Sequence, residues 1–409
     1  MAMKRDDAPM QHWRSPAYLG LLAYCTTSLL VALGAWVGFR FLPAGDSRKP
    51  EKEGFIEAFS AWDGNWYTRI STDGYIVEGQ ETSRRLAFFP LYPLLGRLAQ
   101  KITGFQPYAS LLFISQFCLV LAFIMAASYT TSRFGTDKAA LTEYVVFSLG
   151  LFPPTLFMRM AYTESLFLLF VLLTLYAMEH KWPIASIAIV IAVGTSARFV
   201  GLGLVPVLGY YIWQQGFPVK RRIIWTVFAI PMSTLGIACF VLYQWYYLDS
   251  PLAFLKAQSF WTLRPSEGFE DKVVSLITFE PIWSTYIPSS PGYWGRHNTH
   301  LGILNYSAAE PLYFVGSVAV LTLGACKGWI NRRESLMSFS LLAIAYCGRA
   351  FDMYMTSSAR FVSIVFPVYL VLGIIFSQMG RFLSLGCLTV FAFWLTVYSA
   401  LHVSWYRVL

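Results

Sequence analysis

Long apolar runs constrain this chain more than any other feature of its sequence. The first covers residues 16–42, and similar runs recur up to the C-terminus. A helix needs about 20 apolar residues to span the hydrocarbon core of a bilayer, with every backbone group satisfied inside the segment. Only 13% of the residues are charged, so few segments are polar enough to build a soluble surface. The sequence therefore predicts an all-α polytopic membrane protein.

About eleven transmembrane helices are predicted when the runs are taken in chain order. Arg198 interrupts one apolar block, 183–214, which we interpret as two short spans. Two stretches are too polar to span, and they become large loops, ~43–107 and ~249–308. The candidate spans cover residues 16–42, ~107–132, ~139–158, ~163–179, the two halves of 183–214, ~223–248, ~309–330, ~335–350, ~359–379 and ~382–405.

Basic residues predict the orientation of the chain. Cytoplasmic loops of membrane proteins are enriched in Lys and Arg. With the N-terminus inside, every cytoplasmic loop carries at least one such residue: Arg133, Lys138, Lys181, Lys220, Arg221, Arg222, Arg332, Arg333 and Arg381. The net charge of +9 thus indicates membrane orientation and not nucleic-acid binding. The two large loops then share the outer face of a bacterial inner (plasma) membrane, or the luminal face if the membrane is that of the ER.

The first outer loop is expected to hold helices that lie in the membrane interface. Five apolar residues recur at helical spacing: Phe55, Phe59, Trp62, Trp66 and Ile70. A second helix, opening at Pro90, would place Leu91, Leu94, Leu95, Leu98 and Ile102 on one face and Arg97, Gln100 and Lys101 on the other. A charged face opposite an apolar face is typical of helices that lie on a membrane.

Asp63 is the most informative carboxylate in this loop. It lies among aromatic residues at the depth of the headgroups, where a charge is costly unless it is hydrogen-bonded or used. One alternative is structural, because Asp is a good N-cap and Asp63 could start a helix over 64–72. Asp73, beside Gly74, has a turn as its simplest interpretation.

Several charged residues fall at the predicted outer ends of the spans, the depth of Asp63. They are Arg159, Glu164, Arg198, Arg349, Asp352 and Arg360. Guanidinium groups offer paired donors to phosphate oxygens, so four arginines at one level indicate a phosphate site. Snorkelling to the headgroups would explain one or two of them. A structural ion pair between Arg159 and Glu164 is a further alternative for those two.

The second outer loop offers Asp249, Lys256 and Gln258. Asp249 precedes Ser250-Pro251, so a helix N-cap is its structural alternative. His297 and His300 lack an acidic neighbour and are interpreted as loop histidines. All six cysteines fall in apolar runs (Cys25, Cys118, Cys239, Cys326, Cys347 and Cys387). No metal site is therefore predicted.

The motifs of both loops resemble those of the PIG-V mannosyltransferases, which add the second mannose during GPI-anchor assembly and have shorter bacterial relatives. The first loop carries Trp62-Asp63-Gly64-x-x-Tyr67, Asp73-Gly74-Tyr75 and AFFPLYPLL from Ala87 to Leu95. Similar motifs follow in order: Tyr162 to Ser165, Ser196-Ala197-Arg198, Asp249-x-Pro251-Leu252-Ala253-Phe254-x-x-x-Gln258, and Ser358-x-Arg360-Phe361 before Phe366-Pro367. The resemblance covers residues 62–370.

This resemblance implies a GT-C glycosyltransferase fold, a polyprenyl-phosphate sugar donor, inversion at the sugar carbon, a catalytic Asp63, and no metal or other cofactor. The chain is short beside the eukaryotic enzymes, so the acceptor, a lipid or a glycan, need not be a GPI precursor.

The residues themselves suit such chemistry, which needs a base for the acceptor hydroxyl and cations for the leaving phosphate. Asp63 is the candidate base, and Arg198, Arg349 and Arg360 are the candidate phosphate ligands. The other candidate substrate-binding residues are Trp62, Trp66, Tyr67, Asp73, Glu164, Asp249, Lys256 and Gln258.

A transporter or flippase of a lipid-linked sugar or anionic lipid is the alternative from another functional class. It would also explain many spans and charges at membrane depth. It predicts charges distributed along a path and, often, internal repeats. Here the charges gather toward one face and the two large loops are unequal, so we favour the enzyme.

Overall fold

The computed structural model describes residues 15–45, 54–76, 81–264, 268–296 and 305–406. Within these ranges the regular structure is helical throughout, with no strand. The prediction of an all-α protein is confirmed to that extent. His297 and His300, discussed above as loop histidines, lie outside the described residues.

Five described helices are long and apolar enough to cross a membrane: α2 (Pro16–Phe41), α6 (Pro107–Phe134), α16 (Tyr306–Cys326), α17 (Arg332–Ala345) with its continuation to Met353, and α21 (Arg381–Val403). Two bent pairs raise the number to seven. α7 (Ala139–Leu151) meets η4 (Pro153–Arg159) at 75°, and α11 (Val219–Ser233) meets α12 (Leu235–Leu248) at 50°. α8 (Glu164–Glu179), α9 (Ile184–Ala197), α10 (Val205–Gln214) and α20 (Pro367–Gln378) are shorter. The count of eleven spans is not confirmed.

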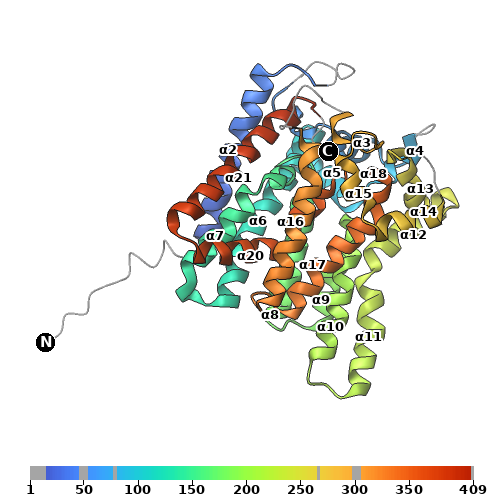
Figure 1. The fold of residues 1–409 in the computed structure, drawn as a ribbon. Coiled ribbons are helices and arrows are strands. Elements are labelled where there is room, and N and C mark those ends of the chain that lie inside the picture. Colours follow the sequence, from blue (N-terminus) through green and yellow to red (C-terminus); the bar gives the residue numbers. More distant parts are fainter. Residues whose placement is uncertain (1–14, 46–53, 77–80, 265–267, 297–304, 407–409) are drawn as a thin grey trace.

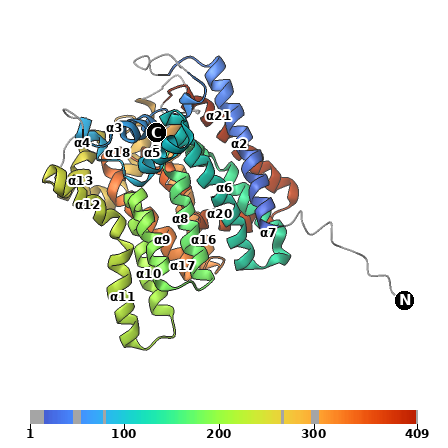
Figure 2. The same ribbon diagram turned by 180° about the vertical axis from the view of Figure 1, so that it is seen from behind.

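The short helices of both large loops gather at one end of the helix bundle, which we call the loop end (Figures 1 and 2). They are α3 (Asp63–Asp73), α4 (Glu81–Arg85) and α5 (Leu91–Thr103) from the first loop, and α13 (Ala253–Ala257), α14 (Phe269–Ile277) and α15 (Glu280–Trp283) from the second. α10 and α11 extend furthest at the opposite end. The first and second loops touch directly, because α4 packs against α13.

The first loop departs from one expectation and meets another. The stripe from Phe55 to Ile70 is not one helix, because a short 3-10 turn (Glu57–Ser60) is separated from α3 by a turn in which Trp62 has a φ of 60°. α5 is amphipathic, as predicted. Leu98 and Ile102 are 53% and 75% exposed, which suits a helix that lies against lipid.

Arg198 divides the block 183–214, as expected. α9 ends at Ala197, Arg198 is extended with a φ of −155°, and the chain turns into a 3-10 segment (Phe199–Leu204) before α10. An extended residue leaves its side chain free of the helix surface, so Arg198 can reach away from both helices.

A second irregular segment follows α17. Residues Tyr346–Ala350 form a π-helical turn, which continues into α18 (Phe351–Met353) and α19 (Ser358–Ser363). Between α18 and α19, Tyr354, Met355 and Ser357 all have positive φ. Such backbone is costly for residues with side chains and persists only where surrounding packing enforces it. Arg349 lies in the π-helical turn and Arg360 in α19, on either side of these three residues.

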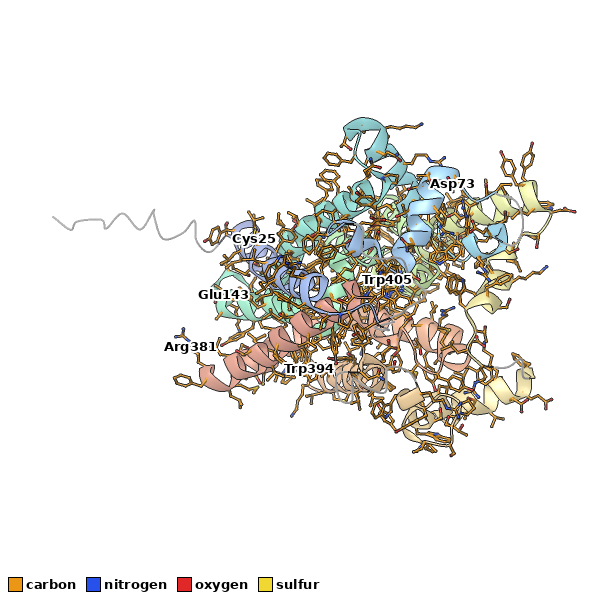
Figure 3. All side chains as sticks on the ribbon, turned by 90° about the horizontal axis from the view of Figure 1, so that it is seen from above. Cys25, Asp73, Glu143, Arg381, Trp394 and Trp405 are labelled. Atoms are coloured by element: carbon orange, nitrogen blue, oxygen red, sulfur yellow. The ribbon has the colours of Figure 1, made fainter. Side chains whose placement is uncertain are left out.

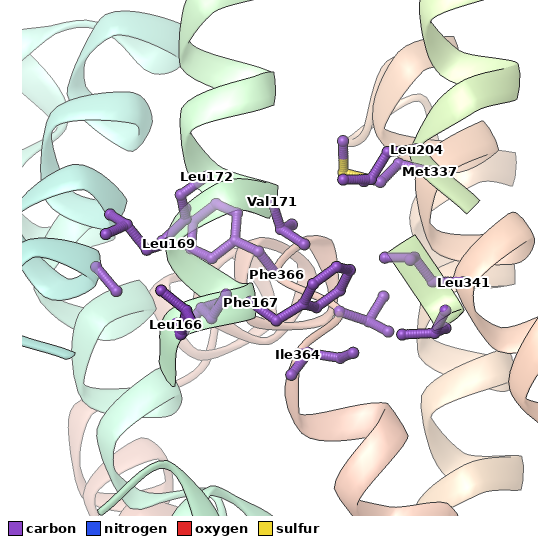
Figure 4. Close-up of a cluster of buried hydrophobic side chains, with 14 of the residues drawn as sticks. Leu166, Phe167, Leu169, Val171, Leu172, Leu204, Met337, Leu341, Ile364 and Phe366 are labelled. Atoms are coloured by element: carbon purple, nitrogen blue, oxygen red, sulfur yellow. The ribbon is translucent and has the colours of Figure 1, made fainter. Parts of the chain in front are cut away.

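Close packing holds the bundle together. α2 and α21 lie side by side (Figure 1), and a Cβ on Gly38 would meet the Ala400 carbonyl oxygen at 2.1 Å. A cluster of buried side chains on α8, α17 and the 364–366 turn, with Phe167, Leu341 and Phe366 among its members, fills the interior (Figure 4). This cluster supports the N-terminus of α8, where Glu164 lies.

Candidate active site

Arg360 joins two acidic residues that lie far apart in the sequence. Its Nη1 donates to Oδ2 of Asp63 at 2.6 Å, and its Nε donates to Oε1 of Glu164 at 2.8 Å. α19 supplies the arginine, the first turn of α3 supplies Asp63, and the first turn of α8 supplies Glu164. A fork of N–H donors suits two carboxylates approached from different sides.

Glu164 also binds the arginine at the helix break. Arg198 Nη1 lies 2.5 Å from the same oxygen, Oε1, and donates to Thr163 Oγ1 at 2.9 Å. The Glu164 side chain is fully buried, and the side chain of Arg198 is 10% exposed. Burying a carboxylate is tolerated when it is paired and hydrogen-bonded, and Glu164 is paired with two guanidinium groups.

A cavity of about 890 Å³ opens beside this cluster. Asp63, Arg198, Arg349 and Arg360 all line it. Its aromatic walls are formed by Trp62, Tyr67, Phe88, Phe89, Phe199, Phe254, Phe260, Trp261, Phe361 and Trp405. Charged groups at one wall and aromatic faces at the others are what a phosphorylated sugar would need, because aromatic rings stack on sugar faces and guanidinium groups bind phosphate.

Arg349 and Gln258 meet at this cavity from different parts of the chain. Arg349 Nη1 donates to Oε1 of Gln258, which follows α13 in the second loop. Among the described residues Arg349 forms no ion pair, whereas Arg198 and Arg360 both do. Its charge is therefore the one in the cluster that a bound anion could neutralise.

Two aromatic residues predicted to wall the site take different positions. Tyr67 lines the cavity, and burial raises its pKa to about 12. The hydroxyl therefore stays protonated at neutral pH. Trp66 lies behind the wall, with its ring stacked on Phe88 at 6.0 Å and edge-on to Trp261 at 5.4 Å.

The structural alternative for Asp63 does not match its geometry. Asp63 is the first residue of α3, and the described N-terminus of that helix has no side-chain cap. Its carboxylate accepts from Arg360 instead. The backbone N–H of Asp63 lies 3.3 Å from the hydroxyl of Tyr162. The local sequence favours a helix start here, but the side chain is drawn to the guanidinium.

Besides Trp66 and Glu164, three candidate residues do not line the cavity. Asp73 ends α3 and pairs with Arg85 at 3.1 Å, with its side chain 51% exposed. Figure 3 shows it well apart from Trp405. Asp249 is exposed at the end of α12 in a left-handed conformation, so it is not the predicted N-cap. Lys256 is exposed and lies 3.4 Å from Ser250 Oγ.

Two further charged residues have partners away from the cavity. Arg159 does not pair with Glu164. It is 2% exposed and donates to Ser28 Oγ at 3.1 Å and to Thr27. It does not line the cavity, so three of the four arginines predicted at this depth meet there, and Arg296 of the second loop is the fourth arginine of the lining. Asp352 pairs with Lys272 of the second loop at 2.9 Å.

Sequence reasoning missed several residues of the site. Trp261, Arg296, Phe361 and Trp405 line the cavity, and Tyr162 lies beneath Asp63. Trp405 packs on Trp62 with ring centroids 5.6 Å apart. Tyr162 and Phe361 belong to motifs already noted. Trp405 follows the last helix, α21, and no local pattern indicated it.

Among the described residues no three His, Cys, Asp or Glu side chains gather as a metal site would require. The expectation that the chemistry needs no metal stays a prediction.

Comparison with protein-family models gave no match, and comparison with curated proteins gave no significant match. Two crystal structures of the Archaeoglobus fulgidus oligosaccharyltransferase are similar to this chain, one in the apo form and one tethered to an acceptor peptide with the NVT sequon. Each has a TM-score of 0.42 and 14% identity and is matched over 94% of this chain, which spans 55% to 56% of the archaeal chain, about half its length.

Proposed function

We propose that this chain is a glycosyltransferase of the GT-C kind. It moves a hexose, mannose in our proposal, from a polyprenyl-phosphate donor to a lipid-linked or glycan acceptor. The observation that carries the proposal is a single cavity in which the Asp63 carboxylate faces guanidinium groups from three separate segments, with aromatic rings on the remaining walls. The PIG-V-like motifs supply the substrate class.

The charge of the cluster supports a donor with one phosphate. Within the cluster Arg198, Arg349 and Arg360 carry three positive charges, and Asp63 and Glu164 carry two negative ones. The fourth arginine of the cavity lining, Arg296, is exposed and lies outside this cluster. A phosphodiester, with one negative charge, would balance the excess, and Arg349 is placed to contact it. Guanidinium groups in a partly dry cavity stabilise phosphate charge more strongly than they would in water.

The proposed step is a direct displacement. The acceptor oxygen forms a bond to C1 of the sugar while the bond from C1 to the phosphate oxygen breaks. The electron pair leaves with the polyprenyl phosphate, where Arg349 and Arg198 stabilise the developing charge. The acceptor proton passes to Asp63, acting as general base. Attack opposite the leaving group inverts the configuration at C1.

We also propose that the loop end faces the outer or luminal side. The motivation is that Arg222 and Arg332, which lie in predicted cytoplasmic loops, stand in the first turns of α11 and α17, and α17 runs from Arg332 to Ala345 at the wall of the cavity. Cysteines introduced at the exposed positions Thr72 and Glu270 should both label with an impermeant thiol reagent in intact cells. Labelling of only one would contradict a shared outer face, and the chain without the new cysteines is the control.

The direct test of the function is sugar transfer by the purified protein. Polyprenyl-phosphate mannose labelled in the sugar is incubated with the protein and a membrane lipid extract, and free polyprenyl phosphate and labelled product are measured. We expect both to rise together. In sealed proteoliposomes, movement of intact donor across the bilayer without release of its sugar would instead identify a flippase.

A further inference from the structure

Tyr162 is a buried residue of the site to which the proposed mechanism gives no role. Its hydroxyl donates to the Ala61 carbonyl at 3.0 Å and lies 3.3 Å from the backbone N–H of Asp63. These two peptide groups flank Trp62. The Tyr162 hydroxyl therefore hydrogen-bonds the peptide groups on both sides of Trp62, the residue that precedes the candidate base.

The backbone held in this way is strained. Trp62 has φ 60° and ψ −115°, and Gly64 N–H donates to the Ala61 carbonyl at 3.3 Å. These values fit the second residue of a type II′ turn, a position that usually holds glycine. A tryptophan pays a steric cost there and stays only if neighbouring contacts enforce the conformation. The Tyr162 hydroxyl supplies two such contacts.

The ring of Tyr162 contacts Arg360, which is the ion-pair partner of Asp63. The guanidinium carbon of Arg360 lies 4.7 Å from the ring centroid, a cation–π distance. The ring is fully buried and is fixed in turn by Phe157, stacked at 5.9 Å, and by His402 at 5.8 Å. Its position is therefore set by packing and not by Asp63 or Arg360.

We propose that Tyr162 is a positioning residue that sets the base and its guanidinium partner relative to each other. The hydroxyl fixes the backbone of Asp63, and the ring face fixes Arg360. Tyr162 does not line the cavity, so it acts through these two residues and not on substrate. This inference rests on the proposed function, because it assigns Asp63 as the base.

Tyr162→Phe separates the two contacts, since it removes the hydroxyl and keeps the ring. Donor binding, which needs the arginines, should stay within about threefold of wild type. Turnover should fall by about 10- to 100-fold, because displacement of a catalytic group by about 1 Å can cost that much. The measured quantity is kcat per donor-binding site, so that misfolded protein is not counted.

Tyr306→Phe is the matched control. Tyr306 is 1% exposed and packs against the same Phe157, but its hydroxyl has no hydrogen-bond partner among the described residues. This variant should keep wild-type kcat per site. If Tyr162→Phe also kept wild-type kcat per site, or lost only the number of donor-binding sites, the positioning role would be wrong. If the wild-type protein released no sugar, the proposed function itself would fail, and this inference with it.

Discussion

Arg360 and Asp63, separated by 297 positions in the chain, share a 2.6 Å hydrogen bond at the wall of the cavity. The contact ties the first large loop to α19. It places the candidate base beside a guanidinium that is itself held by Glu164.

Arg349→Ala should weaken donor binding and leave folding nearly intact. Arg349 contacts Gln258 but no carboxylate among the described residues, so its removal leaves no buried acid unpaired. Loss of a charge-assisted phosphate contact costs about 1.5–3 kcal/mol, or roughly ten- to a hundred-fold in donor affinity. Arg349→Lys should restore only part of this, because an ammonium lacks the paired donors.

The control for that measurement is Arg332→Ala, at the other end of α17, where the side chain is exposed. It should bind donor normally. Donor affinity is measured by titration with labelled donor. If Arg349→Ala bound donor with wild-type affinity, Arg349 would not be a phosphate ligand.

Glu164→Gln should lower stability more than any other single change in the cluster. The substitution removes the charge that both Arg198 and Arg360 face. Breaking a buried ion pair by neutralising one partner typically costs about 3–5 kcal/mol. Thermal unfolding of the purified variant should show a clear loss, and a melting temperature equal to that of wild type would contradict the structural role of this carboxylate.

Asp73→Asn should leave turnover near wild type, although the family motif contains this residue. The side chain is half exposed, lies outside the cavity and pairs only with Arg85 and solvent among its described neighbours. Exposed ion pairs contribute about 0–1 kcal/mol. A loss of turnover beyond about tenfold, with folding intact, would mean that Asp73 approaches the substrate in a state other than the one described.

Most of the coarse architecture could be predicted from the sequence, but the binding partner of each charged side chain could not. The break at Arg198 was predictable because a charge is costly inside an apolar span and because two short spans keep Lys220, Arg221 and Arg222 on the cytoplasmic side. Which carboxylate it binds was not predictable, because the pairing of Arg198, Glu164 and Arg360 depends on helix packing. The turn at Trp62 was not predictable either, because a tryptophan does not favour a positive φ. For Asp73 the motif indicated a role in binding, but the structure shows only a local contact, the ion pair with Arg85.

Alkaline pH should destabilise the protein through its buried tyrosines. Burial raises the pKa of Tyr67 to about 12, whereas an unfolded tyrosine titrates near about 10. Between these values the folded state keeps a proton that the unfolded chain has lost, so stability falls as pH rises, by about 1.4 kcal/mol per pH unit, and is unaffected below about pH 10. Over the same pH range the melting temperature of Tyr67→Phe should fall less steeply with pH than that of wild type. Equal slopes would contradict the raised pKa of Tyr67.

The role of Asp63 as general base can be tested by the turnover of well-folded Asp63→Asn protein. Asn keeps the size of the side chain but cannot take the acceptor proton. With donor binding measured in parallel and Asp73→Asn, at the other end of α3, as the matched control, we predict that turnover falls by about 10²–10⁴ while donor still binds. Near-normal turnover in Asp63→Asn would contradict the account and leave the contact with Arg360 as a structural ion pair.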